Sequence, residues 1–187
     1  PDGGWDLFPG GASDISATVK AYFALKLMGY APDDACMRRA RENIVAKGGV
    51  TKANVFTKIT LALFGQYDWR GVPSMPVEII LFPRWFYFNL TEVSYWSRTV
   101  IVPLLILMDL KPVCRIPAAA SIDELYVPSR AAADLRFPRS ERLFTWKNFF
   151  ITLDRLLHGL ERWTPRPFRA RARQQALTWV LTRMGPG

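Results

Sequence analysis

The sequence predicts an all-α domain built from helical hairpins. Three amphipathic segments follow one another within the first 64 residues, each with apolar side chains at helical spacing and each followed by glycine. The connections between them are short, as expected for helices that pack side by side. No segment alternates apolar and polar side chains for long enough to indicate a β-sheet.

The first predicted helix starts at Ser13 or Asp14, either of which can cap it, and ends at Gly29. The second starts with Pro32, Asp33 and Asp34 and ends at 48–49, and the third spans 51–64. Asp33 and Asp34 lack a third carboxylate nearby, so they are interpreted as a cap and first-turn charges and not as metal ligands. The positions expected to face the core are Ile15, Val19, Tyr22, Phe23, Leu27, Met37, Ala40, Ile44, Val55, Phe56, Ile59, Ala62 and Leu63.

A proline- and aromatic-rich stretch, 66–89, precedes the central helix, with one short helix expected over 76–82. The central helix is expected over 91–110, capped by Thr91 or Ser94 and kinked near Pro103. Its apolar run, 100–108, is far shorter than the ~20 residues that cross a bilayer. Val93, Trp96 and Val100 share one face, so the Trp96 indole either fills the core or lines a cavity.

Residues 111–138 are expected to form a long loop, and 167–184 a last helix. Between them, 140–163 is amphipathic and bordered by arginines. It fits partial insertion into a membrane interface, or an ordinary core-facing helix with a solvated face. The residues expected to be buried in the last helix are Phe168, Ala172, Ala176, Trp179 and Val180.

Positive charge is concentrated at the end of the chain. Residues 1–129 hold 13 basic and 12 acidic side chains, whereas 130–187 hold 12 basic and four acidic ones. A local basic surface favours an acidic partner, either phospholipid headgroups or nucleic acid. The chain has one histidine, His158, and no glycine-rich phosphate loop, so a histidine-based triad or zinc cluster is excluded. Cys36 and Cys114 are interpreted as free buried thiols of a reducing compartment.

Four stretches, at 2–26, 48–73, 75–86 and 94–107, resemble the bacterial squalene–hopene cyclases, a class II triterpene cyclase family. They read DGGWDLFPGGASDISATVKAYFALK, GGVTKANVFTKITLALFGQYDWRGVP, MPVEIILFPRWF and SYWSRTVIVPLLIL. The DGGW sequence is similar to the end of the family's repeated Q-x-x-D-G-x-W motif. The resemblance implies an α/α-barrel, with 1–187 forming most of the second, inserted barrel of a two-barrel enzyme and lacking its first helices.

The resemblance also implies roles for individual residues. Trp96 matches a tryptophan that lines the reaction cavity, and Val93 and Ile101 match positions at a narrow part of the substrate channel. Lys20 and Asn54 lie where some members carry Glu and Arg near the polar rear of the cavity, and both depart from those types. The segment 140–163 matches a helix that dips into one membrane leaflet. Its expected membrane contacts are Phe144, Trp146, Phe149, Phe150, Leu153 and Leu157.

Function follows from the resemblance as an expectation. The family cyclises squalene to hopene or hopanol through carbocations, without cofactor or metal, after protonation by a D-x-D-D motif of the other domain. That motif is absent from this chain, so the chain alone is expected to be inactive. The expected partners are squalene, membrane lipid and the domain carrying D-x-D-D, without nucleic acid and with a homodimer possible, at the cytoplasmic face of the bacterial inner membrane. The alternatives are an oxidosqualene-type cyclase and a basic helical module that binds nucleic acid.

Overall fold

The chain consists of helices and connecting segments. Its structure, a computed structural model, describes residues 2–86, 89–135, 148, 151–152, 157, 159 and 163–184. Within these ranges the only β-structure is an isolated bridge between Asp6 and Ser13. Contacts divide the chain into two interleaved units, 1–72 with 113–137 and 73–112 with 138–187. The all-α prediction is therefore confirmed for the described part of the chain.

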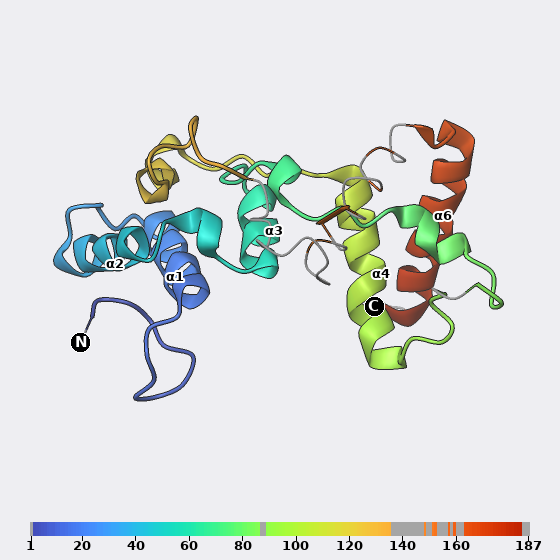
Figure 1. The fold of residues 1–187 in the computed structure, drawn as a ribbon, viewed down its shortest axis with the longest axis horizontal. Helices are drawn as coiled ribbons and strands as arrows, with labels where there is room; N and C mark the ends of the chain where they lie inside the picture. Colours follow the sequence, from blue (N-terminus) through green and yellow to red (C-terminus); the bar gives the residue numbers. More distant parts are fainter. Residues whose placement is uncertain are drawn as a thin grey trace. The chain divides into compact units, whose positions relative to one another are not determined.

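The first unit contains α1 (Ile15–Leu27), α2 (Ala35–Ala46) and α3 (Val55–Leu63), drawn in blue to green-blue in Figure 1. Asp14 caps α1 as predicted, since its side chain accepts a hydrogen bond from the Ala17 amide at 2.8 Å. Asp34 occupies the N-cap position of α2, but its carboxylate accepts from Ala31 N, outside the helix.

Most of the predicted core positions of the first three helices are confirmed. They are Val19, Tyr22, Phe23, Met37, Ala40, Ile44, Ile59 and Ala62, all buried. Leu27 and Phe56 are exposed, contrary to prediction. Leu27 is the last residue of α1, and Phe56 lies in the first turn of α3. The third helix also starts later than predicted, because Val50–Lys52 forms a separate 3-10 turn, η1.

Two adjacent glycines allow the N-terminal turn to lie close to α2. The Asp2 side chain accepts a hydrogen bond from Gly4 N at 3.2 Å and another from Ser13 Oγ. A Cβ at Gly4 would lie 2.5 Å from Ser13 Cβ and 2.9 Å from Asn43 Oδ1. Gly3 has φ +83° and a Cβ there would meet the Arg39 carbonyl oxygen at 2.8 Å. The DGGW sequence therefore has a steric basis in this fold.

Gly4→Ala is expected to lower the free energy of unfolding by about 2 kcal/mol, since the added methyl overpacks a tight contact. Denaturant unfolding of the complete protein measures the change. Gly10→Ala is the control, because a Cβ at Gly10 meets nothing within 4 Å and only its φ of +80° opposes the substitution. A loss below about 0.5 kcal/mol for Gly4→Ala, within the range of an ordinary surface substitution, would show that the close approach is not important.

The predicted loop after the central helix is anchored in the first unit. Its short 3-10 helices η4 (Ala118–Ala120) and η5 (Asp123–Leu125) contact α1 and α2, respectively. Glu124 Oε1 accepts hydrogen bonds from Lys26 Nζ and Tyr22 OH, each at 2.8 Å. Gln66 holds the same loop, accepting from Ile122 N at 3.0 Å and from Tyr126 OH at 2.6 Å.

The Lys26–Glu124 pair is expected to make stability depend on pH. Burial raises the pKa of Glu124, but the hydrogen bonds from Lys26 and Tyr22 outweigh it and leave that pKa below 4.5. A carboxylate whose pKa is lowered in the folded state stabilises the fold at pH values above its unfolded-state pKa. This stabilisation is lost as the pH falls through the folded-state pKa. At pH 7, the free energy of unfolding of Glu124→Gln should therefore be about 1–2 kcal/mol lower than that of the wild type. The difference should shrink below pH 4.5 in urea unfolding of both proteins, and a pH-independent difference would contradict the linkage.

The second unit is built on η3 (Val77–Leu81), α4 (Tyr95–Leu110) and α6 (Arg166–Met184). Ser94 caps α4, accepting from Ser97 N at 3.2 Å, so the second of the two predicted caps is confirmed. The helix continues through Pro103. The short helix predicted over 76–82 is present as the 3-10 helix η3, with Pro76 at its N-cap.

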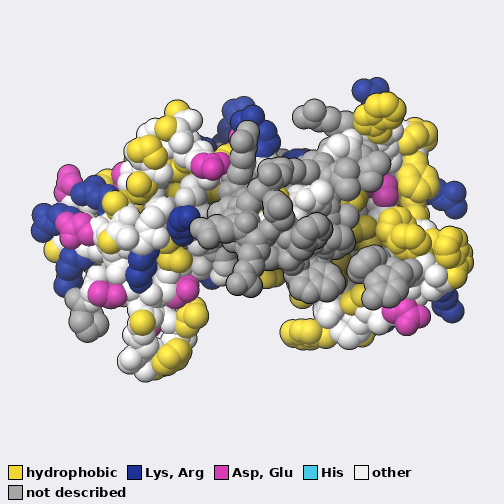
Figure 2. Space-filling view, viewed as in Figure 1, with side chains coloured by type: hydrophobic (Ala, Val, Ile, Leu, Met, Phe, Trp, Pro, Cys, Tyr) yellow, Lys and Arg dark blue, Asp and Glu magenta, His cyan; other side chains and the backbone are white. Residues whose placement is uncertain are grey.

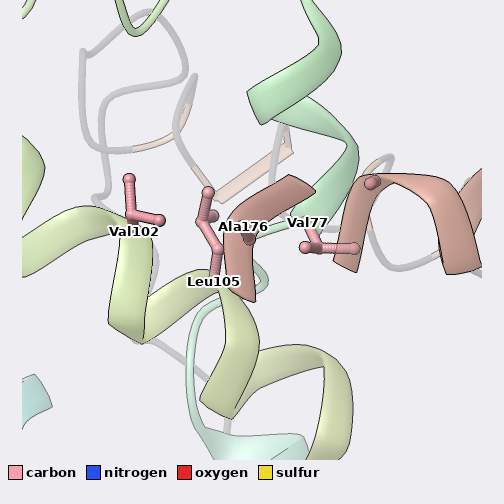
Figure 3. Close-up of a cluster of buried hydrophobic side chains, with 5 residues drawn as sticks. Val77, Val102, Leu105 and Ala176 are labelled. Atoms are coloured by element: carbon pink, nitrogen blue, oxygen red, sulfur yellow. The ribbon is translucent and has the colours of Figure 1, made fainter. Parts of the chain in front are cut away.

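Side chains from all three elements form one apolar core, shown in Figure 3. It consists of Val77, Val102, Leu105, Ala172 and Ala176. The two alanines lie one turn apart on α6, and their small side chains allow a close approach to α4. Phe168, predicted to be buried on α6, is 47 % exposed, whereas Trp179 and Val180 are partly buried against the core.

Both cysteines are free, as predicted, but neither is fully buried. Cys36 is half-buried and Cys114 is exposed. Cys114 belongs to an extended segment whose backbone is held in place, since its amide donates to Leu63 O at 2.6 Å. The backbone of Cys114 is therefore held in place while its thiol faces solvent. The residue types around Cys114 do not reveal this exposure.

Candidate functional site

The N-terminal half of α4 exposes aromatic side chains. Trp96 is 80 % exposed, and Tyr95 and Val100 are also exposed. The core side of the helix is formed by Val102, Leu105 and Met108. Trp96 is therefore not part of the core that the described residues form, and its interpretation as a core residue is wrong for this part of the chain. Its exposed indole is accessible to a ligand or to another part of the complete protein.

The two predicted channel residues lie in different environments. Ile101 is on α4, partly buried against the apolar core. Val93 precedes the Ser94 cap and is half-buried, so it lies outside the helix and does not share a helical face with Trp96. Both belong to the second unit, and so does Trp96. Their predicted role in a channel is not tested by these positions.

A buried amide, which the sequence analysis missed, organises the chain just before α4. Asn89 Nδ2 donates to Arg84 O at 3.1 Å and to Phe86 O at 2.9 Å. Its Oδ1 accepts from the backbone amides of Thr91 and Glu92, each at 3.1 Å. Asn89 therefore links the aromatic stretch to the start of α4. Asparagine favours such an Asx turn because its side chain hydrogen-bonds the backbone that follows, so Asn89 itself is the available sequence signal.

The aromatic stretch itself contains packed rings and one open indole. The Phe82 and Phe86 rings meet edge to face with centroids 4.7 Å apart. Trp85 lies next to Phe86, with centroids 6.1 Å apart, and is 84 % exposed. Together with Trp96 and Trp163, which is 88 % exposed, it gives the second unit three exposed indoles among the described residues.

Two arginines of α6 hold that helix to the rest of the second unit. Arg169 Nε lies 3.0 Å from Glu78 Oε1 of η3 and 3.6 Å from Asp109 Oδ1 of α4. Arg173 lies 3.1 Å from Asp109 Oδ2. The side chain of Asp109 is 4 % exposed and that of Glu78 9 %. These arginines were predicted only as part of a basic surface, whereas the structure pairs them with buried carboxylates.

The two residues predicted near the polar rear of a cavity lie in the first unit. Lys20 is exposed on α1. Asn54 caps α3, since its side chain accepts from Thr57 N at 2.9 Å and its backbone amide donates to Ser16 Oγ at 2.9 Å. Asn54 therefore has a local structural role, and the predicted cavity role of both residues remains a prediction.

Most of the predicted membrane segment lies outside the described residues. That applies to His158 and to Phe144, Trp146, Phe149, Phe150 and Leu153. Leu157 is described as helical and half-buried. None of the helices in the described ranges combines the length and hydrophobicity needed to cross a bilayer. No group of three or more potential metal ligands occurs among the described residues.

The described part of the chain thus combines packed helices with exposed large aromatic side chains, among them Trp85 and Trp96. The model of the squalene-hopene cyclase N-terminal domain family matches residues 1–186. The chain belongs to this α/α-barrel family. The family model is named for an N-terminal domain, and the assignment to a second, inserted barrel stays a prediction.

Individual relatives support the same family assignment. A squalene–hopene cyclase of Zymomonas mobilis is 48 % identical over 182 residues, which are 97 % of this chain and 27 % of that protein. One from Alicyclobacillus acidocaldarius is 38 % identical, covering 97 % of this chain and 28 % of that protein. A dammaradiene synthase of Dryopteris crassirhizoma is 40 % identical, covering 97 % of this chain and 26 % of that protein. The chain thus spans about a quarter of the length of the curated relatives it matches.

Proposed function

We propose that the chain is part of a squalene–hopene cyclase and supplies cavity wall, substrate channel and membrane contact to it. The reaction would convert squalene to hopene or hopanol through carbocations. The observation that carries the proposal is the match to squalene–hopene cyclases over nearly the whole chain. The D-x-D-D acid is absent from this sequence, so the proton would come from another part of the complete protein.

Trp96 is the residue best suited to a role in the cavity. Its indole is 80 % exposed on the outward side of α4. The π-face of an indole attracts cations, and this attraction strengthens when water is excluded. A carbocation passing such a ring would be stabilised without a nucleophile that could trap it. Val93 and Ile101 would narrow the approach, and Lys20 and Asn54 would lie near the polar rear.

The complete protein should therefore consume squalene and release hopene or hopanol. Purified protein in detergent is incubated with squalene, and in parallel with oxidosqualene, and the products are separated by gas chromatography with mass spectrometry. Conversion of oxidosqualene alone would favour the alternative cyclase type. Conversion of squalene mainly to dammaradiene would favour the activity for which one relative, a dammaradiene synthase, is named.

Membrane contact is proposed for 140–163, on the cytoplasmic face of the inner membrane. Squalene is nearly insoluble in water, so a lipid-facing mouth offers a direct supply. Phe149→Asp plus Phe150→Asp is expected to release the complete protein from membranes, because charged side chains oppose insertion of an apolar face. Fractionation by ultracentrifugation measures the release. Thr51→Asp plus Thr60→Asp, in the first unit, is the matched control and should stay in the pellet. Retention of both variants would contradict the proposed contact.

The binding of nucleic acid is the less favoured alternative. Arg169 and Arg173 are paired with buried carboxylates, so these two charges are not presented to a phosphate backbone. The family match adds no support for a nucleic-acid partner. Salt-insensitive binding to neutral vesicles, without retention on a duplex, would support the cyclase proposal.

A further inference from the structure

An open groove in the second unit combines apolar and basic side chains. It has a volume of about 420 Å³ and lies between η3 with the segment after it and α6. Its apolar lining includes Ile80, Leu81, Phe82 and Phe168, and its charged lining consists of Arg84 and Arg171. None of the described residues that line it is acidic. Figure 2 shows basic side chains among apolar ones on the surface where α6 lies.

The basic side chains of α6 are used in two different ways. Arg169 and Arg173, one turn apart, pair with the carboxylates of Glu78 and Asp109. Arg171 lies about 200° around the helix from Arg169, is exposed, and lines the groove. Among the described residues, no carboxylate forms an ion pair with Arg171. Its charge is therefore available to a ligand, unlike the charges of its two neighbours.

The second guanidinium, that of Arg84, comes from a hydrogen-bonded turn, in which Phe86 N donates to Pro83 O at 3.0 Å. The carbonyl oxygen of Arg84 accepts a hydrogen bond from the buried Asn89 side chain. Arg84 likewise forms no ion pair with a described residue. Guanidinium groups bind phosphate oxygens through paired N–H donors, so two of them in one groove favour a phosphate group.

The apolar lining selects among phosphate-bearing partners. Ile80 and Leu81 are partly buried against the core, and Phe168 is half exposed beside the groove. A free phosphate ion gains nothing from such contacts, whereas the glycerol and first acyl carbons of a lipid bury apolar surface there. In addition, α6 starts three residues after Trp163, at the end of the proposed membrane segment 140–163. The groove is thus continuous in sequence with that segment.

We propose that this groove binds the headgroup of an anionic phospholipid, with Arg84 and Arg171 on the phosphate and Phe82 and Phe168 against the glycerol and first acyl carbons. The inference rests on the proposed membrane contact and deepens it by naming the lipid class. It predicts that the complete protein prefers anionic over neutral bilayers because of two particular arginines.

The test measures binding of the complete protein to phosphatidylcholine vesicles with and without phosphatidylglycerol. Arg84→Gln plus Arg171→Gln should weaken binding to the anionic vesicles by about tenfold, because both charges lie at the headgroup. Arg38→Gln plus Arg39→Gln is the matched control, since it removes the same charge from exposed positions of α2. That control should retain most of the anionic preference. Equal losses in the two double variants, or no loss in the groove variant, would overturn the proposal.

Further experiments distinguish binding of a lipid headgroup from binding of a free anion. They also distinguish failure of the groove proposal from failure of the proposed membrane contact. Phe168→Gln should weaken binding to anionic vesicles, whereas Leu181→Gln, also exposed on α6, should not. Competition by inorganic phosphate at millimolar concentration should fail, and displacement of vesicles by it would overturn the lipid assignment. Failure of the proposed membrane contact would appear separately, as unchanged binding of Phe149→Asp plus Phe150→Asp to both vesicle types. Loss of anionic preference in the groove variant, with neutral-vesicle binding retained, supports the headgroup site.

Discussion

Arg169→Met is expected to lower the free energy of unfolding of the complete protein by about 3 kcal/mol. This value is at the low end for a broken buried ion pair, because the arginine is itself partly exposed. Methionine replaces the apolar stem but leaves Glu78 without the guanidinium that lies 3.0 Å away. Asp109 keeps its contact with Arg173, so most of the cost falls on Glu78. Denaturant unfolding followed by circular dichroism measures the change.

Arg171→Met is the matched control for this prediction. It removes the same charge two residues away on α6, where no described carboxylate pairs with it, and should change stability little. Glu78→Gln combined with Arg169→Met should recover part of the loss, because it removes the buried charge left behind. Equal stability of Arg169→Met and Arg171→Met would show that the ion pairs do not hold α6 in place.

Trp96→Ala is expected to slow cyclisation by the proposed enzyme about 10- to 30-fold and to increase early-terminated products. The estimate follows from the ~2 kcal/mol that a cation gains over a desolvated indole. The fold should change little, because Trp96 contributes nothing to the described core of the second unit. Product analysis by mass spectrometry and thermal unfolding should be carried out on the same preparation.

Two further substitutions at this position test the π-face itself. Trp96→Phe retains an aromatic face and should retain most of the product profile. Trp96→Leu retains apolar volume without π-electrons and should behave like Trp96→Ala. Unchanged rate and products in Trp96→Ala would refute the cavity role, whereas a Leu variant as active as wild type would reduce that role to space filling.

The helices of the first unit were predictable because local signals determine them. Asp14 is a strong cap, and Met37, Ala40 and Ile44 repeat at helical spacing, so cap and core face could both be identified. The third helix was predicted too long because Thr51 and Lys52 can join a helix as easily as a 3-10 turn. Element ends are decided by a few weak interactions, which residue types alone do not rank.

The contacts of the candidate site were less predictable because they join residues far apart in sequence. Glu78, Asp109 and Arg169 come from three separate elements, and nothing local links them. Glu124 was placed in a long loop, whereas it binds Lys26 and Tyr22 of α1. The sequence left two roles open for Trp96, in the core or in a cavity wall. Its exposed position on α4 excludes it from the core that the described residues form.

The interleaving of the two units constrains the order in which the protein can fold during synthesis. The first unit needs 113–137, so its Lys26–Glu124 contact forms only after the ribosome has made the intervening 73–112. That intervening segment must in turn wait for α6, which supplies Ala172 and Ala176 to its core. Each nascent unit therefore exposes an incomplete apolar surface while the other is being translated. Contacts of such long sequence separation slow folding and make chaperone assistance advantageous.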